Sequence, residues 1–330
     1  MNQKTTPENL TIANKPFEEL PELKQIKAGL SKKAKQIAPK FFYDSKGSDL
    51  FNKICETNAY YQTRTELGIL QEKSHVIAEL FGVKNVILEP GAGNMRKVRT
   101  LFEAAEPEGY IGIDISKKEV INASYALARD FPRTHIFGIV GDFLHLDNHE
   151  LRESIPDHDS RSVFFPGSTI GNFEPDQAQA FLKQIGNFVG DGGVAIFGVD
   201  LKKSGKVLNL AYNDPEGLTR DFNLNVLTRL NREHGFNFDP SNFNHLAIYK
   251  ENKERVEMHL VSSKRQLVLL GNEVFKFEKG ETIHTENSYK YTKKSFECLV
   301  KASGFNIKAF FTDTREYFGV AVISFQPDNI

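Results

Sequence analysis

Apolar residues recur every three to four positions over residues 17–81, which is the spacing of an amphipathic helix. The repeat is clear in Leu23, Ile26 and Leu30. From Val86 onward the pattern changes to short apolar runs separated by amphipathic stretches, namely NVILEPGAG, YIGIDIS, HIFGIVGDF, SVFFPGSTIGNF and GGVAIFGVDL. Such runs are typical of buried parallel strands. The order of strand, helix and strand therefore predicts a doubly wound α/β sheet.

Beyond Leu201 this regular alternation stops. Residues 207–233 have the spacing of a helix, and residues 246–277 are predicted to form a meander of short strands in which VEMHLV alternates with period two. The α/β pattern returns with a helix over 295–303 and two strands in GFNIKAFFTDTREYFGVAVISF. We therefore expect an inserted lobe within a sheet that ends in a hairpin.

The composition narrows the class of protein. A chain of 330 residues is long enough for about two domains. The hydrophobic share of 40%, with 27 Phe and 10 Tyr, excludes wholesale disorder. Lys and Arg total 42 against 43 Asp and Glu, and the net charge of -1 provides no positive field for a phosphate backbone. Nucleic acid is therefore not an expected partner.

The two cysteines, Cys55 and Cys298, lie far apart and have no CxxC or Cys/His spacing. This pattern argues against a disulfide framework and a structural zinc site, and it favours a reducing compartment. No apolar run has the length of about 18 residues that a membrane span needs, and the first residues lack the apolar core of a signal peptide. A cytoplasmic protein without a membrane partner is expected.

Candidate ligand-binding residues follow three neighbouring strands. Gly91 and Gly93 come after the first strand, where glycines let the backbone approach a ligand. Asp114 ends the second strand, where a carboxylate can accept hydrogen bonds from ribose hydroxyls. Asp142 and Phe143 end the third, where the acid can accept from an adenine amine and the ring can pack on the base. Because open α/β sheets bind ligands at the carboxyl ends of their strands, these residues predict an adenosine site.

The choice of cofactor rests on the glycine loop. A dinucleotide site needs GxGxxG, but Gly93 is followed by Asn94, Met95 and Arg96, so the third glycine is missing. NAD is therefore disfavoured, and a nicotinamide oxidoreductase is the weakest alternative. An acidic residue before the loop and a terminal strand hairpin resemble the class I S-adenosylmethionine-dependent methyltransferases. Taken singly, the glycines could form an ordinary turn and Asp114 could cap a helix.

Five longer motifs extend the resemblance: FFYDSKGSDLF, AYYQTRTELGIL, FFPGSTIGNFEP, FNLNVLTRLNRE and IHTENSYKYT. With them the chain resembles the histidine N-alpha-methyltransferases of ergothioneine biosynthesis over residues 17–325. The resemblance implies a Rossmann-like, doubly wound, seven-stranded methyltransferase sheet with a second, α+β substrate-binding lobe. It also implies a monomer that uses three molecules of S-adenosylmethionine, and no metal, to convert the α-amine of L-histidine to the trimethylammonium of hercynine.

Five segments are expected along the chain. They are a flexible N-terminal arm (1–16), a helical segment that contributes to the substrate lobe (17–81), the first part of the methyltransferase core (82–203), the inserted substrate-binding lobe (204–288) and the last part of the core (289–330).

Carried over by position, the resemblance gives S-adenosylmethionine a set of five contacts: Gly91, Lys97, Asp114, Asp142 and Phe143. The loop reads EPGAGN, whereas many relatives carry a Ser or Thr nearby. This difference leaves the affinity for the cofactor open but not its identity.

The resemblance also assigns the two ends of the amino acid. Asn172 and Tyr212 would hydrogen-bond the histidine carboxylate, which a neutral amide and a phenol can do without adding charge. Tyr43 would lie near the amine as the catalytic residue, together with the backbone of Gly167. We expect no essential catalytic base, since an α-amine with a pKa of about 8 is partly neutral at cellular pH.

The imidazole would be held by Tyr60, Glu286 and Ser288, with Met258 beside the ring. The carboxylate of Glu286 would face the ring N–H, and hydroxyls would meet the other nitrogen. A polar site of this kind disfavours rings without matching donors, because its own groups would be left unpaired.

Each assignment has a structural alternative when its residue is taken alone. Tyr43 and Tyr60 could be core tyrosines, and Asn172 could be a turn residue or a helix cap. Glu286 could pair with a surface lysine, and Met258 could simply fill the core. Three histidines have no metal-ligand spacing and are predicted to be structural: His145, His149 and His284.

Two functional alternatives also stay open. One is an enzyme of the same fold that methylates a different amino acid or amine, and the pair of Glu286 and Ser288 discriminates against it. The other is a non-catalytic adenosine-binding module.

Overall fold

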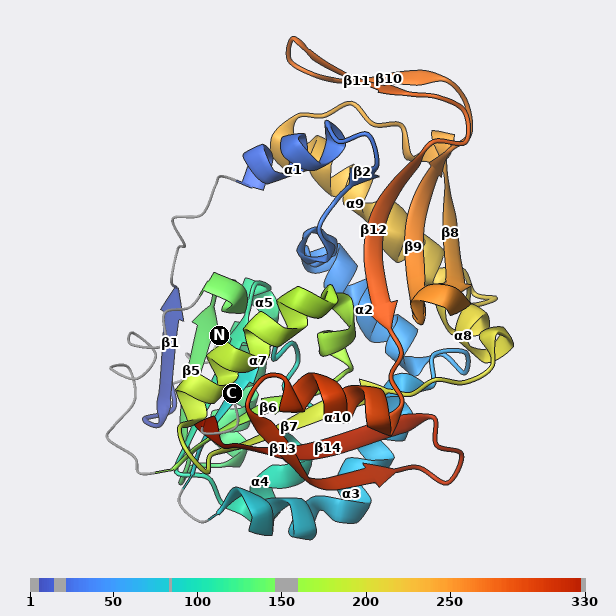
Figure 1. Cartoon of the computed structure of the whole chain (residues 1–330). Helices are drawn as coiled ribbons and strands as arrows, with labels where there is room; N and C mark the ends of the chain where they lie inside the picture. The colour runs from blue at the N-terminus through green and yellow to red at the C-terminus, as the bar shows by residue number, and fades with distance from the viewer. Residues whose placement is uncertain (1–5, 15–21, 83–84, 146–159, 328–330) are drawn as a thin grey trace. The chain divides into compact units, whose positions relative to one another are not determined.

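The computed structural model describes residues 6–14, 22–82, 85–145 and 160–327 (Figure 1). The chain separates into two compact units, each built from segments that are far apart in the sequence. Unit 1 comprises Met1–Phe17, Gln62–Lys202 and Tyr291–Ile330. Unit 2 comprises Glu18–Tyr61 and Lys203–Lys290.

Unit 1 is built on an eight-stranded sheet with the order β1-β5-β4-β3-β6-β7-β14-β13. The strands β1 to β7 in this sheet run parallel, and β14 and β13 add an antiparallel end. Their bounds are β1 (Leu10–Asn14), β3 (Val86–Pro90), β4 (Gly109–Asp114), β5 (His135–Val140), β6 (Arg161–Phe165), β7 (Val194–Asp200), β13 (Phe305–Thr312) and β14 (Phe318–Phe325). The predicted doubly wound sheet and its terminal hairpin are confirmed.

Helices cover both faces of this sheet (Figure 1). They are α3 (Gln62–Phe81), α4 (Arg99–Ala105), α5 (Lys117–Asp130), α7 (Pro175–Val189) and α10 (Lys293–Lys301), with the short 3-10 turns η2 (Phe143–His145) and η3 (Thr169–Asn172). One face packs its apolar residues against α7 and α10, and the other packs against α3, α4 and α5. Among the described residues, no helix combines the length and the hydropathy of a membrane span.

The first described residues differ from the prediction. Leu10–Asn14 pairs in parallel with β5, and so it forms an eighth strand where a flexible arm and seven strands were expected. The side chain of Asn9 fixes this strand, because its Nδ2 donates to the carbonyls of Ala128, Phe131 and Thr134 at 3.1, 3.1 and 2.8 Å. The expectation of an arm is therefore wrong for residues 10–14, and residues 1–5 and 15–16 lie outside the described part.

The helical N-terminal segment is divided between the units, whereas one lobe was expected to receive all of it. Contacts assign α3 to unit 1, where Leu70, Ile77 and Phe81 are buried in the core on one face of the sheet. The apolar residues whose spacing predicted this helix therefore lie on its side that covers β14 and β7. Only Glu18–Tyr61 of the segment joins unit 2.

Unit 2 combines helices with a four-stranded sheet in the order β2-β12-β9-β8 and a separate ribbon of β10 and β11. Its elements are α1 (Glu22–Leu30), β2 (Lys35–Gln36), η1 (Pro39–Phe42), α2 (Ser45–Glu56), α8 (Gly205–Tyr212), α9 (Leu218–His234), η4 (Pro240–Asn242), β8 (Phe243–Lys250), η5 (Glu251–Lys253), β9 (Arg255–Ser262), β10 (Gln266–Leu270), β11 (Glu273–Phe277) and β12 (Thr282–Tyr289). The alternation in VEMHLV is that of β9, which buries Val256, Met258 and Leu260.

The single helix predicted over 207–233 is two helices, α8 and α9. Pro215 lies in the break, and Gly217 adopts a positive φ of 73° that glycine tolerates best. The carboxylate of Asp214 then accepts from the N–H groups of Leu218 and Thr219 at 2.7 and 2.8 Å, which satisfies the first free donors of α9. The helical spacing continues on both sides of the break, so the apolar pattern alone concealed it.

Candidate active site

The glycine loop follows β3 in unit 1. Gly91 and Gly93 both have positive φ, at 68° and 51°, which explains why glycines occupy these positions. The N–H of Gly93 donates to Oδ2 of Asp114 at 2.9 Å. A Cβ atom on Gly91 would lie 3.5 Å from Cε1 of Phe143. The structure therefore brings the loop together with residues from the ends of the next two strands, as predicted from the sequence.

Asp114 ends β4, and its carboxylate accepts hydrogen bonds from the backbone of the glycine loop and of the residues that follow the strand. Oδ2 accepts from Gly93, and Oδ1 accepts from the N–H of Ser116 at 2.8 Å. Burial raises the pKa of Asp114, against the lowering effect of these hydrogen bonds. Each carboxylate oxygen can accept a second hydrogen bond, so the group fits two ribose hydroxyls as well as its present donors.

The end of β5 supplies the third part of the predicted adenosine site. Oδ1 of Asp142 accepts from the N–H of Leu144 at 3.1 Å, which orients the carboxylate within the first turn after the strand. The ring of Phe143 meets Phe165 and Phe181 edge-on, at centroid distances of 5.8 and 5.7 Å. A ring that is fixed in this way can provide an apolar surface for an adenine base.

Replacing Asp114 with alanine is expected to weaken the binding of S-adenosylmethionine about tenfold, because a charged acceptor is lost and the glycine loop loses its partner. Asp114→Asn is the matched control, since the amide keeps the size and one acceptor oxygen. Isothermal titration with S-adenosylhomocysteine measures both variants. Unchanged affinity in Asp114→Ala would remove this residue from the cofactor site.

Lys97, assigned to the cofactor, is held by a residue that the sequence did not single out. Its Nζ lies 2.7 Å from Oε2 of Glu66 in α3, a side chain that is 1% exposed. The same carboxylate accepts from the N–H of Gly167 at 2.9 and 3.0 Å. A Cβ on Gly198 would lie 2.0 Å from Oε1 of Glu66, so the carboxylate also fills the space beside this glycine. Glu66 therefore ties Lys97 to the loop after β6.

Glu66→Gln is expected to reduce the free energy of unfolding by about 1.5 to 3 kcal/mol, because the buried charge that pairs with Lys97 is lost and one of the two acceptor oxygens is replaced by a donor. Urea denaturation measures the change. Glu72→Gln on the same helix is the control, since Glu72 is 71% exposed and a surface pair with Lys73 contributes little. Equal effects in the two variants would contradict the role given to Glu66.

The loop after β6 carries Asn172, which ends η3. Gly167 and Ser168 precede it with positive φ values of 81° and 56°, and Oγ of Ser168 accepts from the N–H of Asp200 at 2.8 Å. These contacts fix the loop. The side chain of Asn172 is partly buried and makes no hydrogen bond with the described residues. Its amide is therefore free to bind a ligand.

The second group of predicted residues lies on β12 of unit 2. Glu286 and Ser288 are two positions apart, so they share one face of the strand. Glu286 is 9% exposed, and within the described part of the chain its carboxylate makes no hydrogen bond. Burial raises the pKa of Glu286 to about 7, against the opposing effect of the Lys290 charge. A buried acceptor without a partner is costly, which is typical of a group that meets a ligand.

Ser288 belongs to a compact hydrogen-bond network. The hydroxyl of Tyr212 donates to its Oγ at 2.7 Å, and Nζ of Lys290 donates to the same atom at 2.6 Å. Lys290 also donates to the Tyr212 hydroxyl oxygen at 3.0 Å. The structure thus joins Tyr212, assigned to the substrate carboxylate, to Ser288, assigned to the ring. Asn172, the other residue assigned to the carboxylate, belongs to unit 1.

A series of aromatic rings in unit 2 contacts this network through Tyr212. The Tyr60 ring meets those of Tyr212 and Phe51 edge-on, at 6.2 and 6.1 Å, and Tyr43 meets Phe51 at 5.7 Å. Burial raises the pKa of Tyr60 well above its usual value, with further increases from Tyr212 and other neighbouring groups, so the phenol stays protonated. Met258 lies opposite Glu286 on β9 and is buried.

The sequence offered signals for both residues that the prediction missed. Lys290 continues the period-two spacing of Glu286 and Ser288 in TENSYK, and a strand of that spacing puts the three on one face. Glu66 lies four residues after Gln62, which places two polar residues on one side of an apolar helix. Both are fully or almost fully buried, and burial is the feature that the sequence does not show.

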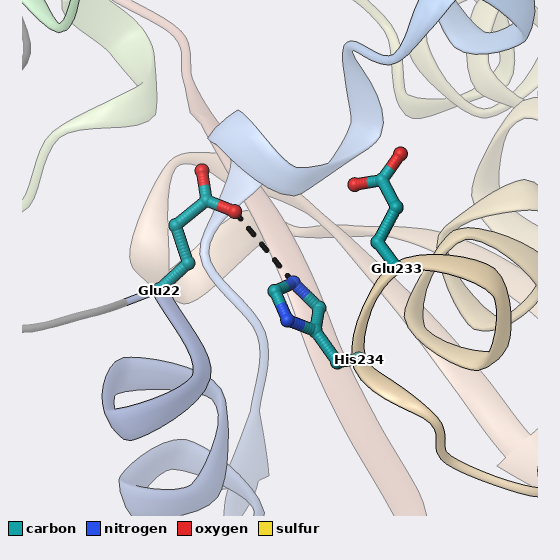
Figure 2. Close-up of side chains that lie close together, drawn as sticks. All are labelled: Glu22, Glu233 and His234. Atoms are coloured by element: carbon teal, nitrogen blue, oxygen red, sulfur yellow. Dashed lines mark ion pairs between the residues drawn. The ribbon is translucent and has the colours of Figure 1, made fainter.

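Another cluster of titratable side chains lies where α1 meets the end of α9 (Figure 2). Nε2 of His234 lies 3.6 Å from Oε2 of Glu22, and the oxygens of Glu233 lie close to both. Arginines already pair with these acids, since Arg229 Nε lies 2.7 Å from Glu233 and Arg232 lies 2.5 Å from it. We therefore interpret the cluster as an ion-pair network, and the absence of a metal requirement stays a prediction.

Of the three histidines predicted to be structural, the structure describes the side chain of His284. Nε2 of His284 lies 2.9 Å from Oδ1 of Asn287, and burial lowers the pKa of this histidine. His149 and the side chain of His145 lie outside the described part of the structure.

The comparisons with known proteins agree with this geometry. The chain matches the family model described as "Histidine-specific methyltransferase, SAM-dependent" over residues 22–325. The protein is therefore an S-adenosylmethionine-dependent methyltransferase with a Rossmann-like sheet. This match also selects methyl transfer over the nicotinamide and non-catalytic alternatives.

Three curated relatives cover most of the chain. Histidine N-alpha-methyltransferase of Mycobacterium tuberculosis is 32% identical over 91% of this chain and 93% of its own length. The enzyme of the same name from Mycolicibacterium smegmatis is 34% identical with the same coverage. Ergothioneine biosynthesis protein 1 of Schizosaccharomyces pombe is 26% identical over 88% of this chain and 39% of its own length. The chain belongs to the histidine-specific methyltransferase family.

Proposed function

We propose that the enzyme transfers three methyl groups to the α-amine of L-histidine and forms hercynine, in the first step of ergothioneine biosynthesis. The observation that carries this proposal is the carboxylate of Glu286, which is 9% exposed and has no hydrogen-bond partner in the described part of the chain. The names and coverage of the bacterial relatives support the same substrate.

The ring of histidine matches the groups on β12. A neutral imidazole has one N–H donor and one bare nitrogen acceptor. Glu286 can accept from the N–H, and the hydroxyl of Ser288 lies two positions along the same strand face. An indole offers no bare nitrogen and a phenyl ring offers neither group, so both would leave a buried polar side chain unpaired. The cost of such a group is about 1 to 3 kcal/mol, which favours histidine over these amino acids.

The carboxylate is assigned to neutral donors. Asn172 presents an amide without a protein partner among the described residues, and Tyr212 presents a phenol. The proton of Tyr212 already goes to Ser288 at 2.7 Å. We therefore assign the larger share of carboxylate binding to Asn172. Binding of this charged end is what distinguishes a free amino acid from a simple imidazole amine such as histamine.

When bound, S-adenosylmethionine supplies an electrophilic methyl carbon; the amine lone pair attacks this carbon, so an N–C bond forms while the C–S bond breaks and its electron pair leaves with the sulfur. Over three rounds an ammonium substrate and three sulfonium ions give a trimethylammonium product, three thioethers and three protons. The residues of the chain hold the amine still, because orientation alone can provide effective molarities of about 10⁵ M. No side chain needs to act as a strong base, since water can accept each proton.

Tyr43 is assigned to the neighbourhood of the amine, and Tyr60 is assigned to the ring. Because burial raises the pKa of Tyr60, its phenol remains neutral and cannot serve as a base at physiological pH. The phenol oxygens and ring faces can stabilise the growing methylammonium by about 0.5 to 2 kcal/mol. Such stabilisation is independent of the number of methyl groups, which suits three successive rounds on one nitrogen.

Mass spectrometry of the reaction with histidine and S-adenosylmethionine tests the proposal. We expect products heavier by one, two and three methyl groups, with the trimethylated product at the end point. Histamine, tryptophan and tyrosine are the comparison substrates. A single methylation that stops, or faster reaction with another amine, would favour the alternative of an N-methyltransferase with a different substrate.

We further propose that the enzyme works in the cytoplasm as a monomer, without metal or nucleic acid. The net charge of -1 supports the last point, because it offers no positive field for a phosphate backbone. Light scattering tests the oligomeric state. Activity that is lost in EDTA and restored by a divalent ion would contradict the metal-free mechanism.

A further inference from the structure

A third polar residue stands on the same side of β12 as Glu286 and Ser288. Lys290 follows the strand directly and is 1% exposed, so its ammonium is removed from water. Nζ donates to Oγ of Ser288 at 2.6 Å and to the hydroxyl oxygen of Tyr212 at 3.0 Å, and it lies 5.0 Å from the centroid of the Tyr212 ring. A buried ammonium has a high desolvation cost, and these two acceptors belong to the group of residues assigned to histidine.

The hydrogen bonds of Ser288 determine how it can meet a ligand. A hydroxyl has two acceptor positions and one donor. Its Oγ already accepts from Lys290 at 2.6 Å and from Tyr212 at 2.7 Å, which uses both acceptor positions. The one remaining function of this hydroxyl is to donate its own proton. Ser288 is therefore poised to donate to a bare ring nitrogen and not to accept from a ring N–H.

Charge on Lys290 has a second effect, on Glu286. The Lys290 charge opposes the effect of burial on the pKa of Glu286, which lies at about 7. Among the described residues, Tyr60, a protonated phenol, is also in electrostatic contact with Glu286, and the residue opposite on β9 is the apolar Met258. The positive charge of Lys290 therefore favours the ionised form of Glu286, which is the stronger hydrogen-bond acceptor.

We propose that Lys290 is a positioning residue that fixes the polarity of the ring-binding groups, with Ser288 as donor and Glu286 as acceptor. The site then selects a ring that presents one N–H and one bare nitrogen. Lys290 acts through its neighbours, and the inference rests on the proposed function of the site. It adds a residue to the site and gives a physical cause for the hydrogen-bond directions that the resemblance implied.

The pH dependence of hercynine binding separates this role from a purely structural one. Hercynine carries a trimethylammonium without a proton, so its amine cannot titrate. Wild-type affinity should decline as the pH falls below about 7, because protonated Glu286 is an uncharged and weaker acceptor for the ring N–H. In Lys290→Met the decline should move up by about one pH unit or more, since the opposing charge is lost. The ring of free hercynine titrates in the same way in both experiments, so its contribution cancels when the pH profiles of the variant and the wild type are compared.

Lys290→Gln provides the second variant. Its amide can still donate to Ser288 but carries no charge, so it should show the same pH displacement with a smaller loss of affinity at high pH. It keeps the test available if Lys290→Met does not fold. Affinity for S-adenosylhomocysteine and the thermal unfolding temperature establish that each variant is folded.

Isothermal titration of the full chain with hercynine therefore gives distinct outcomes. A decline at the same pH in wild type and in both variants would overturn the role of Lys290, even if affinity fell uniformly. Failure of the wild-type enzyme to bind histidine or hercynine would instead overturn the proposed function. A displaced decline together with normal wild-type binding supports both.

Discussion

Replacing Glu286 with alanine is expected to lower kcat/KM for histidine by about 10- to 150-fold, which corresponds to the loss of a hydrogen bond to a charged group, about 1.5 to 3 kcal/mol. The reason is that the ring N–H of histidine loses its buried acceptor. Steady-state kinetics at saturating S-adenosylmethionine measure the change. A loss below tenfold would remove Glu286 from the ring-binding site.

Glu286→Gln is the matched control for this experiment. Glutamine keeps the shape of the side chain but adds a donor and removes the charge. It should therefore retain more activity than alanine and should alter the ring preference, with relatively better use of an amino acid whose ring presents only bare nitrogen. Equal ring preference in Glu286→Gln and the wild type would argue that the carboxylate does not contact the ring.

The second large effect is expected at the other end of the substrate. Asn172→Ala should reduce kcat/KM for histidine at least tenfold, or by about 1.4 kcal/mol, because the carboxylate loses a neutral donor. Asn172→Asp should be more harmful, since it has nearly the same size but places a negative charge against a carboxylate. The ratio of kcat/KM between Asn172→Ala and Asn172→Asp is therefore the informative measurement.

Histamine, which has no carboxylate, is the control substrate for Asn172. Its reaction should be equally slow in the wild type and in Asn172→Ala. We expect the loss of either Glu286 or Asn172 to reduce kcat/KM more than the loss of any single contact to the cofactor. Asp114→Ala should therefore retain more activity than Glu286→Ala or Asn172→Ala. If Asn172→Asp proved as active as the wild type, the amide would have no role in carboxylate binding.

The fold was predictable where burial covers both faces of an element. The strands β3 to β7 consist mostly of apolar residues, and a glycine or an acidic residue lies at or just after the end of each, so their type and their order could be inferred. β1 could not, because its five residues are partly polar and become a strand only by pairing with β5. The unit to which α3 belongs also depends on packing, which the periodicity of a helix does not reveal.

For the site, the sequence could propose candidate residues but not their contacts. The motifs indicated Glu286, Ser288 and Tyr212 individually. The hydrogen bond from Tyr212 to Ser288 spans 76 positions, and the bond from Gly167 to Glu66 spans 101. Such partners meet only when distant elements pack together, so the donor directions and the buried cation had to come from the structure.

The position of β1 also determines which backbone groups are exposed at this edge of the sheet. Without it, β5 would be the outermost strand of the sheet, with six residues and one row of backbone groups open to pairing with another molecule. β1 covers that row and presents a shorter border of five residues. β1 thus shortens the backbone edge that is open to pairing, and removal of Leu10–Asn14 is expected to increase self-association of the protein.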